Sequence, residues 1–260
     1  MIRESLGNHL IKPDDHFRFR GKEPGRLENL SDGVFALAIT LLLISTSAPT
    51  TFNQVKQFVC ELIPFTICIV LIVLIWWEHV AFFYRYGIRD AKIVFLNTTF
   101  LILLLFYVYP LKFLWRMLTL YPLSRILNQP DLSENLSPML RSTSDTASLM
   151  IIYGVGLASV FFVLALMYRH ALAKSETLGF NSIEKFDTRS SIRTNLLMSA
   201  IPTLSLILAI ILKDNRYVGL ISGFTYMLYM PVMFTHGYLM AKRREKLISD
   251  FEVPLNTTIT

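Results

Sequence analysis

Six runs of apolar residues, separated by short polar links, constrain this chain more than any other feature of its sequence. The runs cover about residues 33–48, 62–83, 93–118, 147–168, 196–212 and 217–241. A helix of about 20 apolar residues has the length needed to cross a bilayer, and a helix satisfies its own backbone polar groups in lipid. The sequence therefore predicts an all-α integral membrane protein, built as a bundle of six transmembrane helices.

Composition agrees with a membrane protein and argues against other classes. Hydrophobic residues make up 53% of the chain and charged residues only 17%, as expected for a protein dissolved in the lipid bilayer. The net charge of +6 does not come from a basic run interleaved with aromatic residues, so we expect no nucleic-acid partner. The motifs HExxH, GxSxG and GxxxxGK are absent. We therefore expect no enzyme activity and no cofactor.

The distribution of Lys and Arg predicts how the bundle sits in the membrane. Eighteen of the 25 lie in the first 26 residues, the second and fourth links and the tail, and seven lie in or beside the other three links. The more basic side of a membrane protein faces the cytoplasm. We therefore predict a multi-pass cell-membrane protein with both termini cytoplasmic. It has an N-terminal arm at 1–25, a transmembrane domain at 26–241, a basic tail at 242–260 and a long polar loop outside, at 121–145.

Polar residues near the first apolar run admit two interpretations. In RLENLSD, Ser31 and Asp32 could simply cap the helix, because their side-chain oxygens accept the orphan N–H groups of a helix start. Alternatively, they form part of a polar cluster with His79 of the second run and Asn97 of the third. In the predicted orientation all four lie at a similar depth near the cytoplasmic end. Taken singly, His79 could be a histidine at the membrane interface, and Asn97 could make an interhelical hydrogen bond that only holds helices together.

The first run also carries two neighbouring stripes when its residues are placed at 100° steps around a helix. One stripe is small or hydroxyl-bearing and consists of Gly33, Ala36, Thr40 and Ser47. The other has i, i+4, i+7 spacing and consists of Leu37, Leu41 and Ile44. Small residues suit close helix contact. On periodicity alone, the Leu/Ile stripe would face lipid.

RLENLSD resembles the RxxxFSD signature that opens the first helix of the transmembrane protein 175 family of potassium channels. Arg26, Ser31 and Asp32 match it, and Leu30 stands where the family has Phe. The resemblance covers about residues 26–110 and includes Trp76, His79, Asn97, Tyr109 and Pro110. A single signature with six apolar runs is similar to the prokaryotic branch of the family, whose members assemble as homotetramers.

This resemblance implies a potassium-preferring cation channel whose central pore is lined by the first helix of each subunit. It implies a pore constriction at Leu37, Leu41 and Ile44, and a candidate ion contact at Thr40. It also implies a structural polar network that fixes the pore helix, formed by Arg26, Ser31, Asp32, His79 and Asn97. The permeant potassium ion would be the only ion bound. Apolar rings in a narrow pore exclude water, so we expect modest selectivity.

Two other functions remain open at this point. A secondary or proton-coupled transporter would use Asp32, Glu78 and His79 as a proton relay. Arg26 and Glu78 could equally extend to the lipid headgroups. Transporters of this kind often have broken helices and paired inverted repeats, and neither is visible in the sequence. The third reading is a non-conducting membrane scaffold.

Overall fold

The structure, a computed structural model, describes residues 16–44, 50–126 and 143–256. All regular structure within these residues is helical, which confirms the predicted all-α class. The elements are α2 (Arg26–Ile44), α3 (Phe52–Tyr86), α4 (Ala91–Ile126), α5 (Thr143–Ala173), α6 (Ser182–Ile211), α7 (Val218–Phe224), the 3₁₀ helix η3 (Thr225–Leu228) and α8 (Tyr229–Asn256).

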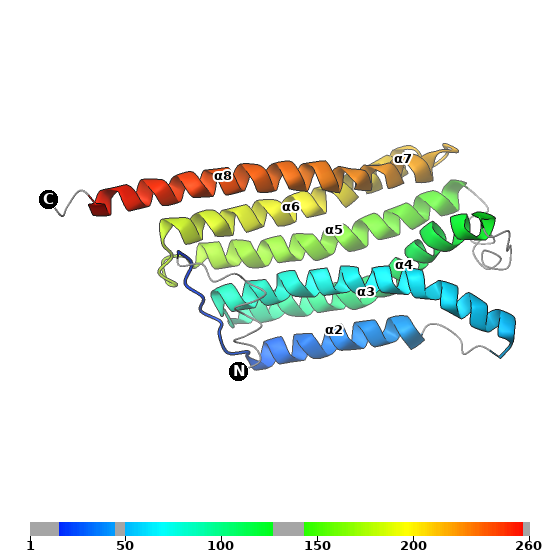
Figure 1. Cartoon of the computed structure of the whole chain (residues 1–260), viewed down its shortest axis with the longest axis horizontal. Helices are drawn as coiled ribbons and strands as arrows, with labels where there is room; N and C mark the ends of the chain where they lie inside the picture. The colour runs from blue at the N-terminus through cyan, green and yellow to red at the C-terminus, as the bar shows by residue number, and fades with distance from the viewer. Residues whose placement is uncertain (1–15, 45–49, 127–142, 257–260) are drawn as a thin grey trace.

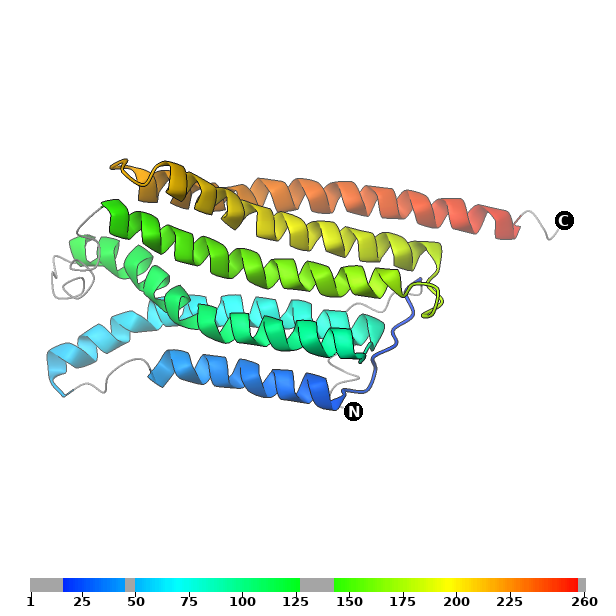
Figure 2. The same cartoon turned by 180° about the vertical axis from the view of Figure 1, so that it is seen from behind.

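The long helices lie side by side and run along one common direction (Figures 1 and 2). Helix α2 packs on α3 and α4, α4 packs on α5, α5 on α6, and α6 on α8. Helices α2 and α8 therefore form opposite edges of the bundle. Each of these edge helices is covered by the rest of the chain on one side only.

Five segments have the length and apolar composition of a membrane span: Gln54–Tyr86, Ala91–Arg116, Thr143–Ala173, Ser182–Ile211 and Val218–Asp250. They correspond to the second to sixth predicted spans. The first predicted span overlaps α2, a helix of 19 residues with Glu28 in its first turn and Asp32 further along. The last part of that predicted span, residues 45–48, lies outside the described residues.

Several helices extend beyond their apolar runs, which corrects the predicted boundaries. Helix α4 continues to Ile126, so the polar loop does not begin at residue 121, and the rest of that loop up to 142 lies outside the described residues. Helix α8 continues past Ala241 to Asn256, so residues 242–256 of the predicted tail are helical. Lys, Arg and Glu are good helix formers, so a helix can continue beyond its apolar segment into water.

Local sequence signals explain where α3 and α6 begin. At Thr51 and Gln54 of α3, and at Asn181 and Glu184 of α6, each side chain accepts the backbone N–H of the other residue. This reciprocal capping box satisfies two of the orphan donors of a helix start. It places the start of α6 at Ser182, well before the apolar run at 196–212.

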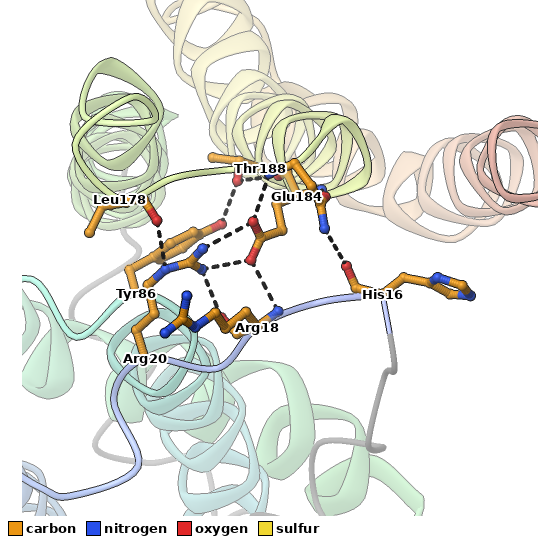
Figure 3. A network of polar contacts seen from close by, with 8 residues as sticks. His16, Arg18, Arg20, Tyr86, Leu178, Glu184 and Thr188 are labelled. Atoms are coloured by element: carbon orange, nitrogen blue, oxygen red, sulfur yellow. Dashed lines mark hydrogen bonds and ion pairs between the residues drawn. The ribbon is translucent and has the colours of Figure 1, made fainter. Parts of the chain in front are cut away.

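The N-terminal arm, residues 16–25, lies against α6 and the link before it (Figure 3). The Arg20 guanidinium donates to both carboxylate oxygens of Glu184, at 2.7 and 3.0 Å, and also to the Leu178 carbonyl at 3.1 Å. The backbone N–H of Arg18 donates to Glu184 at 3.0 Å. We call the pair Arg20 and Glu184 the arm clamp.

The arm also packs tightly against the end of α3. The Gly21 N–H donates to the Tyr84 carbonyl at 3.0 Å, and a Cβ at Gly21 would collide with the carbonyl oxygen of Phe83. Gly87 ends α3 with a φ of 59°, a left-handed conformation that favours glycine. Only small residues fit where the two backbones meet.

One end of the bundle gathers all four segments that the sequence assigns to the more basic side. The arm contacts the links at 87–90 and 174–181, and Arg244 of α8 donates to Asp187 of α6 at 2.9 Å. We call this end the arm end. The opposite end, where α2 finishes and α3 begins, is the far end (Figure 1).

Candidate functional site

Helix α2 presents two different faces. The face toward α3 and α4 carries side chains no more than 3% exposed, namely Ser31, Phe35, Ala38 and Leu42. On the other face, Leu37 and Leu41 are 50% and 43% exposed. Because α2 lies at the edge of the bundle, this second face is open in a single chain.

The predicted constriction and ion-contact residues map onto the open face as far as they are described. Thr40 is exposed, and its hydroxyl donates to the Ala36 carbonyl at 2.9 Å, which leaves the hydroxyl oxygen able to accept or to bind a cation. Ile44 is the last residue of α2, and its side chain lies outside the described part of the structure. A Cβ at Gly33 would meet nothing within 4 Å.

Ser31, Asn97 and His79 form a buried chain of hydrogen bonds between α2, α4 and α3, which we call the buried cluster. The Asn97 amide donates to Ser31 Oγ at 2.9 Å, and Asn97 Oδ1 lies 2.7 Å from His79 Nε2. Since an amide oxygen only accepts, Nε2 must carry the proton in this contact. Each of the three is at most 1% exposed. The cluster therefore ties α2 to both neighbouring helices.

Aromatic rings enclose the imidazole of the buried cluster. The His79 ring stacks on Phe100 with centroids 5.3 Å apart and contacts Phe83 at 4.9 Å and Phe35 at 5.6 Å. His79 Nδ1 is buried and has no hydrogen-bond partner among the described residues. An apolar cage of this kind favours the neutral ring, because burial of an unpaired charge is costly.

The other two residues of the predicted network lie elsewhere. Asp32 Oδ1 accepts from Trp76 Nε1 at 2.9 Å, a separate α2–α3 contact. Arg26 is exposed, and no hydrogen bond or ion pair joins it to the part of the chain that the structure describes. Glu78 is half-buried, and no hydrogen bond among the described residues links it to Asp32 or His79.

The capping interpretation of Ser31 and Asp32 is wrong, because α2 begins at Arg26, more than one turn earlier. Glu28 takes the capping role: its Oε1 accepts the Gly25 N–H at 3.0 Å and is 3.2 Å from Arg89 Nη2. A carboxylate suits the positive end of the helix dipole. The signal for this cap was the acidic residue three places after Gly25.

Two cations of α4 lie near the far end of α2 and α3, and the predicted site residues did not include them. Lys112 and Arg116 were counted only with the charges around the polar loop, although both lie within the third apolar run and, in the structure, within α4. Lys112 Nζ donates to the Leu42 carbonyl at 2.7 Å, and Arg116 Nη2 donates to Glu61 Oε1 at 2.8 Å. Spacing of i, i+4 places both cations on one face of α4.

Comparisons with known proteins agree on one family. The family model described as "Endosomal/lysosomal potassium channel TMEM175" matches residues 26–107, which include α2, α3 and the buried cluster. A protein of Marivirga tractuosa named "Potassium channel" is 43% identical over 243 residues, 93% of this chain and 97% of that protein. The crystal structure of a variant of the potassium channel MtTMEM175, in complex with a Nanobody-MBP fusion protein, is similar with a TM-score of 0.79. The two sequences are 42% identical, and the match covers 89% of this chain and 100% of the chain in that structure.

Proposed function

The chain belongs to the prokaryotic branch of the TMEM175 family, and we propose from this that it is a potassium-preferring cation channel. Relatives named as potassium channels match nearly the whole chain. The observation that carries the proposal is the open apolar face of α2, since this helix also bears the family signature.

We propose further that four copies assemble with α2 nearest the common axis. A single chain presents α2 at its edge, so a closed pore requires other copies to complete its wall. In such an assembly Leu37, Leu41 and Ile44 of each subunit form the constriction, and the Thr40 hydroxyl oxygen offers a contact to a partly dehydrated ion. Helix α8 then lies on the lipid side.

Ion passage in this arrangement depends on hydration. The constriction formed by these Leu and Ile rings, which we call the neck, excludes water when it is narrow. It therefore conducts when the α2 helices separate enough for water to enter it. Potassium loses its hydration shell at lower cost than sodium. The neck therefore favours potassium without a ring of carbonyl ligands. The buried cluster and the Asp32–Trp76 contact keep the leucines aimed at the axis.

We orient the arm end toward the cytoplasm, with six membrane crossings counting α2. The support is the gathering of the basic segments at that end. Single cysteines in place of Asp214 and Ser249, in a chain lacking Cys60 and Cys68, should react with an impermeant thiol reagent from opposite sides of intact cells. Reaction of both from one side would contradict this topology.

Potassium flux into proteoliposomes, measured with a pH-sensitive dye and a proton ionophore, tests the proposed function. The protein should conduct potassium down its gradient and favour it over sodium. Leu37→Ala should widen and wet the neck, raising flux and lowering the preference for potassium. Leu74→Ala, at an exposed leucine of α3, is the matched control and should change neither.

Two outcomes would overturn the proposed function, and a third would overturn the assignment of the pore to α2. Absence of potassium flux would remove the channel function altogether. Flux that requires an imposed proton gradient would favour the coupled transporter instead. If Leu74→Ala altered selectivity as much as Leu37→Ala, the pore would not be lined by α2.

A further inference from the structure

Lys112 is a charged residue buried within a membrane-length helix. Its side chain is only 6% exposed, and its ammonium donates to the backbone carbonyl of Leu42 in α2 at 2.7 Å. Ionisable residues inside membrane helices are costly to bury and usually serve a function. The channel signature and the constriction do not account for this lysine.

The Leu42 carbonyl, which accepts the hydrogen bond from Lys112, lies where a positive charge is favourable. Leu42 is in the last turn of α2, which ends at Ile44. The carbonyls of a last turn point out of the helix and carry the negative end of its dipole. The Lys112 ammonium therefore stabilises the end of α2 by both a hydrogen bond and its charge.

An ion pair lies one turn further along α4. Arg116 donates to Glu61 of α3 at 2.8 Å, so this carboxylate already has its own cationic partner. The pair joins α3 to α4, whereas Lys112 joins α4 to α2. The two contacts together link all three helices at the far end.

The Lys112 contact is placed so that it acts on the proposed constriction. Leu42 is 1% exposed and faces the bundle, while the preceding Leu41 is 43% exposed and faces outward. A shift of the Leu42 backbone carries Leu41 with it, because both belong to one rigid helix. Moving the end of α2 would therefore change the width of the neck.

Two residues of α4 hold α2 at points along its length. Asn97 bonds Ser31 nearer the arm end, and Lys112 bonds Leu42 nearer the far end. In an α-helix the rise between Ser31 and Leu42 is about 16 Å. The leucines of the proposed constriction lie between these two points. A helix held at both points cannot tilt or turn on α4 without breaking one contact.

We propose that Lys112 is a positioning residue for ion conduction, whose ammonium anchors the far end of α2 and so sets the spacing of the constriction. This inference rests on the proposed channel function. The ammonium does not touch the permeant ion in this role. It acts through the backbone of the pore-lining helix.

The first test replaces the lysine and measures the potassium-to-sodium permeability ratio from reversal potentials in planar bilayers. Lys112→Met removes the donor, and we expect at least about a threefold change in potassium flux and a twofold change in the ratio. Lys112→Arg keeps a donor and should lie closer to the wild type. Lys56→Met is the control, because it removes an exposed cation near the far end that contacts Phe52 rather than α2.

The second test leaves every side chain intact. An α-hydroxy acid at position 43 replaces the Leu43 amide with an ester, which makes the Leu42 carbonyl a weaker acceptor. The same exchange at Ile39 weakens the Ala38 carbonyl and is the matched control within α2. We expect the ester at 43 to alter the permeability ratio in the same direction as Lys112→Met, and the ester at 39 to leave it closer to the wild type.

The outcomes separate the two proposals. Wild-type protein without potassium flux overturns the proposed function, and this inference with it. A conducting wild type with an ester at 43 that behaves like the ester at 39 overturns the inference alone. Where Lys112→Met fails to assemble on size-exclusion chromatography, the ester pair decides the question.

Discussion

The buried cluster fixes α2 to α3 and α4, whereas the arm clamp fixes the preceding N-terminal arm to α6, and the two contacts use different chemistry. The cluster joins Ser31, Asn97 and His79 by neutral hydrogen bonds, and each residue is at most 1% exposed. The clamp joins two opposite charges, and its arginine keeps 13% of its side-chain surface exposed. The neutral contact lies within the membrane-length helices, whereas the charged contact lies where the chain leaves them.

This difference follows from the cost of removing charge from water. A buried ion pair recovers its desolvation cost only when additional hydrogen bonds satisfy both partners. Glu184 meets this condition, because it also accepts the backbone N–H groups of Arg18 and Asn181. The buried cluster avoids the cost altogether with an amide, a hydroxyl and a neutral imidazole. We expect the clamp to be the stronger contact and the one more sensitive to its environment.

The largest effect is expected when the clamp loses its carboxylate. Glu184→Ala leaves the largely buried Arg20 guanidinium without its carboxylate partner, and we expect a loss of about 3–5 kcal/mol in the free energy of unfolding. Thermal unfolding of the detergent-solubilised protein measures it. Glu176→Ala is the control, because Glu176 is an exposed acid in the link just before α6. Equal loss for both variants would show that the clamp carries little stability.

A smaller loss is expected in the buried cluster. Asn97→Leu leaves the Ser31 hydroxyl and the His79 Nε2–H without this partner, at a cost of about 1–3 kcal/mol. The neighbouring Thr98→Val changes an exposed hydroxyl on the same helix and should be nearly silent. The loss at Asn97 should not vary with salt concentration, because no charged group is involved. A salt-dependent loss would contradict the neutral assignment.

Coupling between residues gives a finer test of which contacts belong together. His79→Phe and Asn97→Leu share one hydrogen bond, so their losses should fall short of additive by about 0.5 kcal/mol or more. Asp32→Asn acts on Trp76 instead, and its loss should add to that of His79→Phe within about 0.5 kcal/mol. Double-mutant cycles on thermal unfolding supply both numbers. Strong coupling of Asp32 with His79 would mean that the two contacts form a single network.

The smallest effect concerns pH at the arm end. Burial opposes ionisation of Asp90, but hydrogen bonds from Lys174, His170 and the Ile93 N–H outweigh it and hold its pKa well below the usual value. A lowered folded-state pKa contributes stability that is present above the unfolded pKa, about 4, and is lost as pH falls through the folded value.

Because the Asp90 side chain is 28% exposed, we expect its contribution to be no more than about 1 kcal/mol. Asp90→Asn should lower the unfolding temperature at pH 7, and the difference from the wild type should shrink below about pH 4. Unfolding curves measured between pH 3 and 7 check this. A difference that stays constant over that range would contradict the assignment.

Comparison of particular residues shows how far sequence reasoning reaches. The resemblance named the family correctly, and periodicity placed Leu37 and Leu41 on one face of the first helix. The residue types also singled out Ser31, His79 and Asn97, because buried polar groups in apolar helices need partners. The resemblance grouped Arg26 with them, and the structure leaves Arg26 exposed. Sequence reasoning gave Lys112 no role, because the lysine was only counted among the charges around the long loop.

The sequence by itself determined that this chain is an all-helical membrane protein, that Leu37 and Leu41 share one face of its first helix, and which family it belongs to. These properties depend on local composition and on spacing along one helix. Only the tertiary structure decided that Trp76 binds Asp32, that Arg20 binds Glu184, and that Lys112 reaches the Leu42 carbonyl. These contacts join residues far apart in the chain, such as Arg20 and Glu184, and their geometry depends on how whole helices pack. No periodicity within a single segment carries that information.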